Sequence, residues 1–161
     1  MDDYKKCLCN AEILILGIGN ILLRDEGIGV RVIEALKKLQ LPENVELVDG
    51  GTAGADLLDI ISNRRRVIII DAIEGDYSTG SIVCFGNEDI EKLQGYGINS
   101  LHNINILETL AMARLLGSHP ENIVIVGIKP DSIDCGTELS EKIKSIVPDV
   151  IEVVLSMAKV H

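Results

Sequence analysis

Short aliphatic runs alternate along this chain with stretches of helical spacing, and this alternation limits the possible folds more than any other feature. Runs rich in aliphatic residues and bounded by turn residues predict strands over residues 13–16, 45–48, 67–70, 81–85 and 123–127. Apolar residues three or four positions apart predict helices over residues 28–39, 53–61, 103–116 and 139–157, the last with a kink or break at Pro148. The pattern is typical of an α/β fold, a doubly wound sheet with helices on both faces.

Two segments lie outside this alternation. Residues 86–100 are mostly polar or interrupted by glycine, which predicts a loop over one edge of the sheet. Residues 1–11 are expected to form a flexible N-terminal tail. Residues 12–161 are expected to form a single domain, because a chain of 161 residues suits one folding unit.

The chain carries 25 acidic and 15 basic residues, which gives a formal net charge of −10. Such a surface repels nucleic-acid phosphates and anionic lipids, so we expect neither nucleic acid nor a membrane as a partner. The sequence shows neither a signal segment nor an apolar run of bilayer length, so we expect a cytoplasmic protein. We expect the four cysteines, Cys7, Cys9, Cys84 and Cys135, to be reduced thiols, since this aliphatic core needs no disulfide.

Acidic residues follow two of the predicted parallel strands, at the carboxyl ends where doubly wound sheets bind ligands. Asp71 directly follows a buried strand, so its carboxylate is accessible through the crevice there, unless it caps a turn at Ile73 or Glu74. Asp25 is expected to cap the helix that follows it, because a carboxylate near a helix N-terminus is favourable. Glu26, which points in a different direction, can then face the strand ends.

His102 is the histidine expected near this crevice, since His119 lies in a surface turn and His161 is the last residue. Together, Glu26, Asp71 and His102 offer two carboxylates and one imidazole. This set can bind a divalent first-row metal and leave coordination positions open. The three residues are far apart in sequence, and their spacing alone does not fix that they meet.

Two other chemistries fit the sequence less well. Gly17 and Gly19 after the first strand and Asp49 after the second match part of a dinucleotide-binding fingerprint, but Leu22 occupies the position of its third glycine. A serine hydrolase is not indicated, because the chain lacks a Gly-x-Ser-x-Gly nucleophile elbow. Cys135, in a loop, has no adjacent base to activate it as a nucleophile.

Several segments, in order along the chain, resemble the motifs of the hydrogenase maturation endopeptidases. They read GIGNILLRDEGIG at residues 17–29, DGGTAG at 49–54, DA at 71–72, SLH at 100–102, and GIKP at 127–130 followed by LS at 139–140. The resemblance implies a three-layer αβα sandwich of the phosphorylase/hydrolase-like type. It also implies a five-stranded, mostly parallel sheet in the order 2-1-3-5-4 with strand 4 antiparallel, which suits the short strand at residues 81–85.

The resemblance also implies a function, namely an endopeptidase that removes a C-terminal extension from the large-subunit precursor of a nickel-iron hydrogenase after nickel insertion. It assigns Glu26, Asp71 and His102 to contact with the nickel that the precursor carries. Glu26, Asp71 and Asp49 are the catalytic candidates, and Asp49 is either a general base or the residue that orients the Gly50-Gly51 turn. The alternative is a non-catalytic nickel-binding chaperone or sensor with the same ligands. Substrate choice is expected to depend on residues 86–100.

Overall fold

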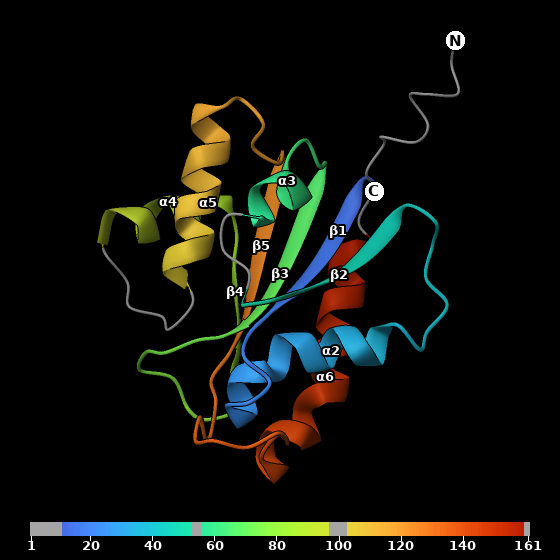
Figure 1. Cartoon of the computed structure of the whole chain (residues 1–161), viewed down its shortest axis with the longest axis vertical. Coiled ribbons are helices and arrows are strands. Elements are labelled where there is room, and N and C mark those ends of the chain that lie inside the picture. The colour runs from blue at the N-terminus through green and yellow to red at the C-terminus, as the bar shows by residue number, and fades with distance from the viewer. Residues whose placement is uncertain (1–10, 53–55, 97–102, 160–161) are drawn as a thin grey trace.

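The computed structural model describes residues 11–52, 56–96 and 103–159, which form an α/β sandwich (Figure 1). The strands β1 to β5 span Ile13–Ile18, Val45–Gly51, Arg66–Ala72, Ile82–Phe85 and Asn122–Ile128. The helices are the 3₁₀ helix η1 (Arg24–Gly27) and the α-helices α2 (Ile28–Leu36), α3 (Leu57–Ile61), α4 (Asn87–Tyr96), α5 (Asn103–Leu115) and α6 (Glu141–Ala158). All five predicted strands are confirmed, and so are the four predicted helices, with ends shifted by a few residues. The proposed tail, residues 1–11, falls almost wholly outside the described residues and stays a prediction.

The strands form one sheet in the order β2-β1-β3-β5-β4. β1 pairs in parallel with β2 and with β3, and β3 pairs in parallel with β5. β4 pairs antiparallel with β5 at the edge of the sheet. The strand order and the antiparallel fourth strand that the resemblance implied are therefore confirmed. The chain crosses from β1 to β2 on one side and continues to β3 on the other, so the carboxyl ends of β1 and β3 form the topological switch point of the sheet.

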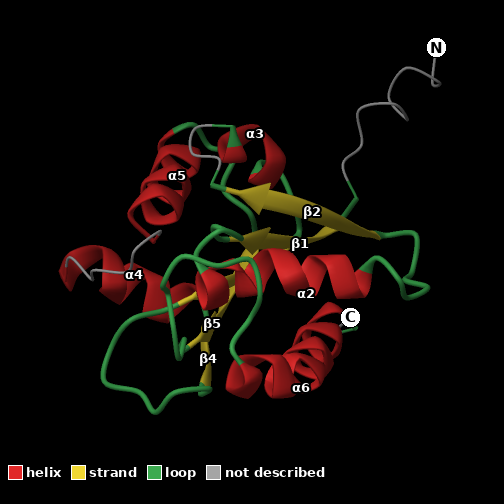
Figure 2. Cartoon of the chain, turned by 60° about the horizontal axis from the view of Figure 1, so that its bottom comes forward, coloured by secondary structure: helices red, strands yellow, loops and turns green. Residues whose placement is uncertain are grey.

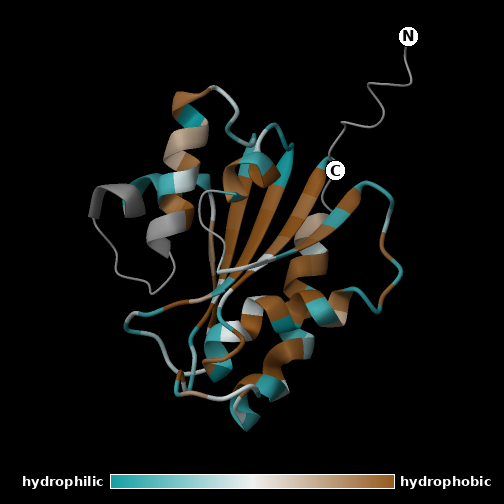
Figure 3. Cartoon of the chain, viewed as in Figure 1, coloured by the Kyte–Doolittle hydropathy of each residue, from teal (hydrophilic) through white to brown (hydrophobic). Residues whose placement is uncertain are grey.

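Side chains alternate between the two faces of the sheet and build two apolar cores. One core joins β1, β3 and β5 to α2 and α6, and the other joins the same strands to α3, α4 and α5 (Figure 2). Figure 3 shows the aliphatic strands as the continuous apolar centre of the molecule. Along β3, Ile68, Ile70 and Ala72 face α2 and α6, whereas Val67 and Ile69 face the opposite layer. By the same alternation, Asp71 lies on the face covered by α3, α4 and α5.

The predicted loop at residues 86–100 is wrong for its first part, because residues 87–96 form helix α4. Asn87 anchors this helix to β5, since its side-chain nitrogen donates to the Glu121 carbonyl (3.1 Å) and its side-chain oxygen accepts from the Ile123 amide (2.7 Å). Ile90 is buried against the sheet. A mostly polar helix with only two aliphatic residues, Ile90 and Leu93, gives little periodic signal, which explains the error.

Helix α6 runs from Glu141 to Ala158 with Pro148 inside it, so the break that the sequence suggested there does not occur. The two described cysteines, Cys84 and Cys135, are free thiols, as expected. Cys7 and Cys9 lie outside the described residues. Among the described helices, none has the length and apolar character that crossing a membrane requires.

Candidate functional site

The carboxyl ends of β1, β2 and β3 bring the predicted site residues to one edge of the sheet. Gly17 of β1 is level with Asp49 of β2 on one side and with Ile70 of β3 on the other. Asp71 is therefore one residue beyond this level on β3. Glu26 belongs to η1, which follows β1 and packs against β3. Glu26 and Asp71 thus meet at the switch point, where this fold class binds ligands.

Asp71 is completely buried. Neither of its carboxylate oxygens has a hydrogen-bond partner of good geometry among the described residues. Burial raises its pKa well above the usual value, the Ala72 amide partly offsets this, and the nearby charge of Glu26 raises it further. The alternative that Asp71 caps a turn at Ile73 or Glu74 is not borne out, because neither of its oxygens accepts a hydrogen bond of good geometry among the described residues. The Ile73 amide donates instead to the Ile128 carbonyl (2.9 Å). A buried carboxylate without a hydrogen bond of good geometry is energetically costly, and such groups are common at functional sites.

Glu26 is also buried, with 3% of its surface exposed, and it lies close enough to Asp71 to affect the pKa of that residue. Glycine makes this position possible. Gly19, at the end of β1, has a φ of +143°, and a Cβ on it would collide with the carbonyl oxygen of Glu26. A Cβ on Gly27 would lie 2.8 Å from the Cα of Ile21. Gly19, one of the two glycines that resembled a nucleotide-binding fingerprint, and Gly27 therefore allow the Glu26 loop to fold tightly against β1.

Asp25 does not cap a helix, so that prediction is wrong. Neither η1 nor α2 has a side-chain cap, and the Asp25 carboxylate is buried in contact with a distant segment. Its Oδ2 accepts from the amides of Asp131 (3.0 Å) and Ser132 (2.8 Å) and from the Ser140 hydroxyl (2.7 Å). Its Oδ1 accepts from the Ser140 amide (2.7 Å). These four bonds hold the loop of Glu26 against residues 131–140.

Backbone hydrogen bonds strengthen the same junction. The Arg24 amide donates to Gly136 (3.0 Å), the Gly136 amide donates to Leu22 (2.9 Å), and the Asp25 amide donates to Ser132 (3.0 Å). The main chain directly before Glu26 is therefore fixed by a segment more than a hundred residues later. No spacing rule connects these segments, although the resemblance pointed to the sequences at 127–130 and 139–140.

Asp49 lies at the same edge but in a different environment. Its side chain is exposed, and its Oδ1 accepts a hydrogen bond from the Gly51 amide (2.9 Å). Gly51 has a φ of +47°, a conformation that suits glycine. Asp49 also lines an open hollow of about 270 Å³ whose walls include Gly19 and Asn20. Its hydrogen bond matches the predicted turn-orienting role, and its exposure leaves it accessible to a substrate.

His102, the third predicted metal ligand, lies outside the described residues. Among the residues that the structure does describe, no three His, Cys, Asp or Glu side chains are grouped so that they could hold a metal ion. The structure therefore brings two of the three predicted ligands together, Glu26 and Asp71. It places Asp49 at the same edge of the sheet but exposed.

Comparison with known proteins identifies the family. The family model described as hydrogenase maturation protease matches residues 30–157, a range that includes Asp49 and Asp71 and begins after Glu26. The chain is 38% identical over 147 residues to the hydrogenase 2 maturation protease of Escherichia coli, covering 90% of this chain and 89% of that protein. It is 37% identical over 143 residues to the hydrogenase expression/formation protein HupD of Rhizobium leguminosarum, covering 88% and 71%. The chain belongs to the hydrogenase maturation protease family.

Solved structures agree with this membership. The hydrogenase-maturating endopeptidase HybD from Escherichia coli superposes on this maturation protease with a TM-score of 0.86 at 35% identity, covering 92% of each chain. The hydrogenase maturation protease HybD from Thermococcus kodakarensis gives a TM-score of 0.77 at 29% identity, covering 92% of this chain and 99% of that one. The chain is therefore an endopeptidase with the fold of its relatives.

The geometry of the maturation protease favours some hydrolytic chemistries over others. Partial burial raises the pKa of the Cys84 thiol, which disfavours the thiolate that a cysteine nucleophile needs. At the switch point, by contrast, Glu26 and Asp71 place two buried carboxyl groups near each other, and their like charges raise the energy of the doubly ionised state. A cation between them would offset that repulsion. Oxygen donors of this kind suit a divalent first-row metal ion.

Proposed function

We propose that this maturation protease removes the C-terminal extension of a nickel-iron hydrogenase large-subunit precursor after nickel insertion. In this proposal, Glu26, Asp71 and His102 contact the nickel that the precursor carries, so the metal arrives with the substrate. The reaction takes place in the cytoplasm and involves neither nucleic acid nor a membrane. Residues 12–161 form the single α/β domain that carries out this reaction.

The observation that carries this proposal is the buried carboxylate of Asp71 beside that of Glu26. Neither of its two oxygens has a hydrogen-bond partner of good geometry among the described residues, and it lies at the switch point of the sheet. A structural carboxylate is normally surrounded by donors, as that of Asp25 is. The contrast between these two acids supports a ligand role for Asp71 and a structural role for Asp25.

A metal contact would make processing conditional on nickel loading. Each tenfold difference in affinity corresponds to about 1.4 kcal/mol, so a few kcal/mol of metal contact separates loaded from empty precursor by several orders of magnitude. The formal charge of −10 does not provide this selectivity, because it acts equally on both precursors. Direct contact between the carboxylates and nickel provides it.

Two routes to peptide-bond hydrolysis fit these groups. The nickel can polarise the scissile carbonyl or a water molecule, or a carboxylate can act as general base. Asp49 is our candidate base, because it is exposed at the same edge and lines the hollow beside Gly19. Glu26 and Asp71 remain candidates for the same step in addition to their contact with nickel.

The proposal is tested by mass spectrometry of large-subunit precursor incubated with the full chain, with nickel loaded and with nickel absent. We expect loss of a C-terminal peptide only from the loaded precursor. Glu26→Gln, Asp71→Asn and His102→Gln should each slow this cleavage by roughly 100-fold, the effect of losing a few kcal/mol of metal contact. Asp59→Asn, which changes an exposed carboxylate on α3, is the matched control and should cleave normally.

Equal cleavage of loaded and empty precursor would contradict nickel recognition while leaving the protease activity intact. Absence of cleavage from every cognate loaded precursor would favour the chaperone alternative. The metal content of the purified protein separates these functions further. A protease that uses the nickel of its substrate should be isolated essentially without nickel, whereas a chaperone should bind nickel tightly on its own.

A further inference from the structure

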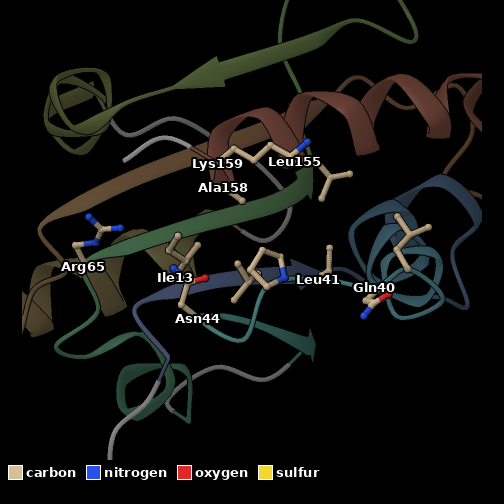
Figure 4. A pocket seen from close by; sticks show the side chains of 11 residues that line it. Ile13, Gln40, Leu41, Asn44, Arg65, Leu155, Ala158 and Lys159 are labelled. Atoms are coloured by element: carbon tan, nitrogen blue, oxygen red, sulfur yellow. The ribbon is translucent and has the colours of Figure 1, made fainter.

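A second concave region lies at the opposite end of the sheet, where the parallel strands begin. This amino-end pocket has a volume of about 620 Å³ and is lined by residues from the starts of β1, β2 and β3, from the segment 39–44, and from the end of α6. Figure 4 shows Ile13 and Asn44 on one side of it and Leu155, Ala158 and Lys159 on the α6 side. A volume of this size lies within the range of small-molecule sites, roughly 300–1,000 Å³.

The amino-end pocket is separate from the Glu26 and Asp71 site. β3 is seven residues long, from Arg66 to Ala72, and each residue of a strand advances about 3.3 Å. The two regions therefore lie roughly 20 Å apart along the sheet. Nothing in the proposed processing reaction uses this end of the molecule.

The pocket wall is largely aliphatic, with Ile13, Leu41, Val45, Leu155 and Ala158 among its lining residues. A further wall residue, Leu39, remains 46% exposed, which is a large fraction for a leucine that lines a pocket. Covering these groups with an alkyl chain would contribute about 25 cal/mol for each Å² of apolar surface removed from water. The body of a fitting ligand is therefore apolar.

The rim is positive, unlike the protein as a whole. The described residues that line the pocket or adjoin a lining residue in sequence include five basic side chains and three acidic ones: Lys38, Arg64, Arg65, Arg66 and Lys159 against Glu12, Glu43 and Glu46. The formal charge of the chain is −10. A local excess of positive charge in so acidic a protein provides charge complementarity to an anion.

Of the two basic residues that line the pocket itself, Arg65 and Lys159, Lys159 is the one available to a ligand. Arg64 pairs with Glu46 (2.6 Å), Arg65 pairs with Glu12 (3.5 Å), and Arg66 donates to the Met157 carbonyl (2.6 Å). Lys159 itself lines the pocket, its side chain is exposed, and no ion pair is found for it among the described residues.

The lysines of this rim also have a structural explanation, which is that they lie near the ends of helices. α2 and α6 both end near this pocket, and lysine near a helix C-terminus compensates the partial negative charge there. That charge amounts to only about half an elementary charge for each helix. Two helix ends therefore offset about one of the two excess positive charges, and the rim stays positive.

We propose that the amino-end pocket binds a medium-chain alkyl carboxylate, with the chain against the aliphatic wall and the carboxylate on the Lys159 ammonium. The ligand class follows from one apolar cavity, one available cation and the absence of other unpaired charge on its described lining. This site is independent of the proposed processing function and is tested without any hydrogenase precursor.

The test is a titration of the isotope-labelled full chain with decanoate below its micelle-forming concentration, followed by NMR and calorimetry. We expect saturable shifts at Ile13, Leu39 and Leu155 with a dissociation constant of about 1 mM or tighter. Lys159→Gln should weaken binding roughly two- to fivefold, the effect of losing one solvent-exposed charge contact. Ala158→Leu, which fills the cavity, should also weaken it.

Lys142→Gln, at the other end of α6, is the matched control and should leave the affinity unchanged. Decanol and acetate separate the contributions of the chain and the charge, and each should bind more weakly than decanoate. Equal binding of decanol would overturn the role of the anion, and no saturable shift with decanoate would overturn the site. Shifts of the pocket residues that depend on protein concentration and not on decanoate would assign the pocket to a second copy of the chain, which also overturns the proposal.

Discussion

Asp25 and Ser140 are 115 positions apart in sequence, and the carboxylate of one accepts two hydrogen bonds from the other, from the Ser140 amide and from its hydroxyl, both at 2.7 Å. Ser140 is the N-cap residue directly before α6, and Asp25 directly precedes Glu26. The start of the last helix is therefore tied to the loop that carries a site residue.

Removal of the Asp25 carboxylate should destabilise the chain through this junction. Asp25→Ala leaves the amides of Asp131, Ser132 and Ser140 without their acceptor, and each buried unsatisfied donor costs about 1–3 kcal/mol. We expect a loss of roughly 3 kcal/mol or more in the free energy of unfolding, measured by urea denaturation. Ser140→Ala removes only the hydroxyl bond and should cost about 1 kcal/mol. If Asp25→Ala and the exposed-site control Asp59→Ala had equal stability, the junction would contribute nothing.

Gly19 is expected to be required for the position of Glu26 and not merely for a turn. Gly19→Ala introduces a Cβ that collides with the Glu26 carbonyl. We therefore expect the free energy of unfolding to fall by roughly 2–4 kcal/mol, measured by urea denaturation, and nickel-dependent cleavage to become slower. Gly117→Ala is the matched control. Gly117 also has a positive φ, +69°, but no atom lies within 4 Å of the position that a Cβ would take there. The Gly117→Ala variant should lose only about 1–2 kcal/mol of its free energy of unfolding and keep full cleavage activity. If both variants lost similar amounts of stability, Gly19 would be required only for its backbone conformation and not for the close contact with Glu26.

Asp71 should give the metal-free protein a distinct pH dependence. Burial and the Glu26 charge raise the pKa of Asp71 in the folded chain, so the folded state binds its proton more tightly than the unfolded state does. The stability from this proton is fully present below the unfolded pKa and is lost as the pH rises through the folded pKa. Asp71→Asn does not titrate. The stability of this variant relative to the parent should therefore increase with pH across that window, measured by urea unfolding at a series of pH values. Parallel stability curves would contradict the raised pKa.

Asp49→Asn separates the two roles of Asp49. The variant retains a side-chain oxygen that can accept from the Gly51 amide, so the fold and its stability should be unchanged. If Asp49 is the general base, cleavage of loaded precursor should fall by about 10²–10⁴-fold. We expect this loss, measured as the single-turnover cleavage rate at saturating precursor. Full activity would exclude the base role and leave Asp49 as the residue that orients the turn.

Much of the fold could be predicted from local sequence, because a strand buried on both faces is a continuous aliphatic run. Ile68, Ile69 and Ile70 are all completely buried in β3, as such a run requires. The burial of Asp71 follows from the same run. Helix α4 could not be predicted in this way, because Ile90 and Leu93 are its only aliphatic residues and most of the helix is polar.

The site could be predicted only in part. The closeness of Glu26 and Asp71 follows from strand topology, since both lie at the switch point between β1 and β3. The role of Asp25 could not be predicted, because a carboxylate before a helix normally caps it and its actual donors come from residues 131–140. Contacts between segments so distant along the chain leave no periodic signal in either segment.

The junction between Asp25 and Ser140 also has a consequence for biosynthesis. During translation, the loop that bears Glu26 emerges more than a hundred residues before 131–140, the residues that hold it in place. A nascent chain therefore contains the catalytic candidates long before it can arrange them. The hydrogen bonds that fix this loop can form only after residues 131–140 have been made, so its final geometry is set late in folding.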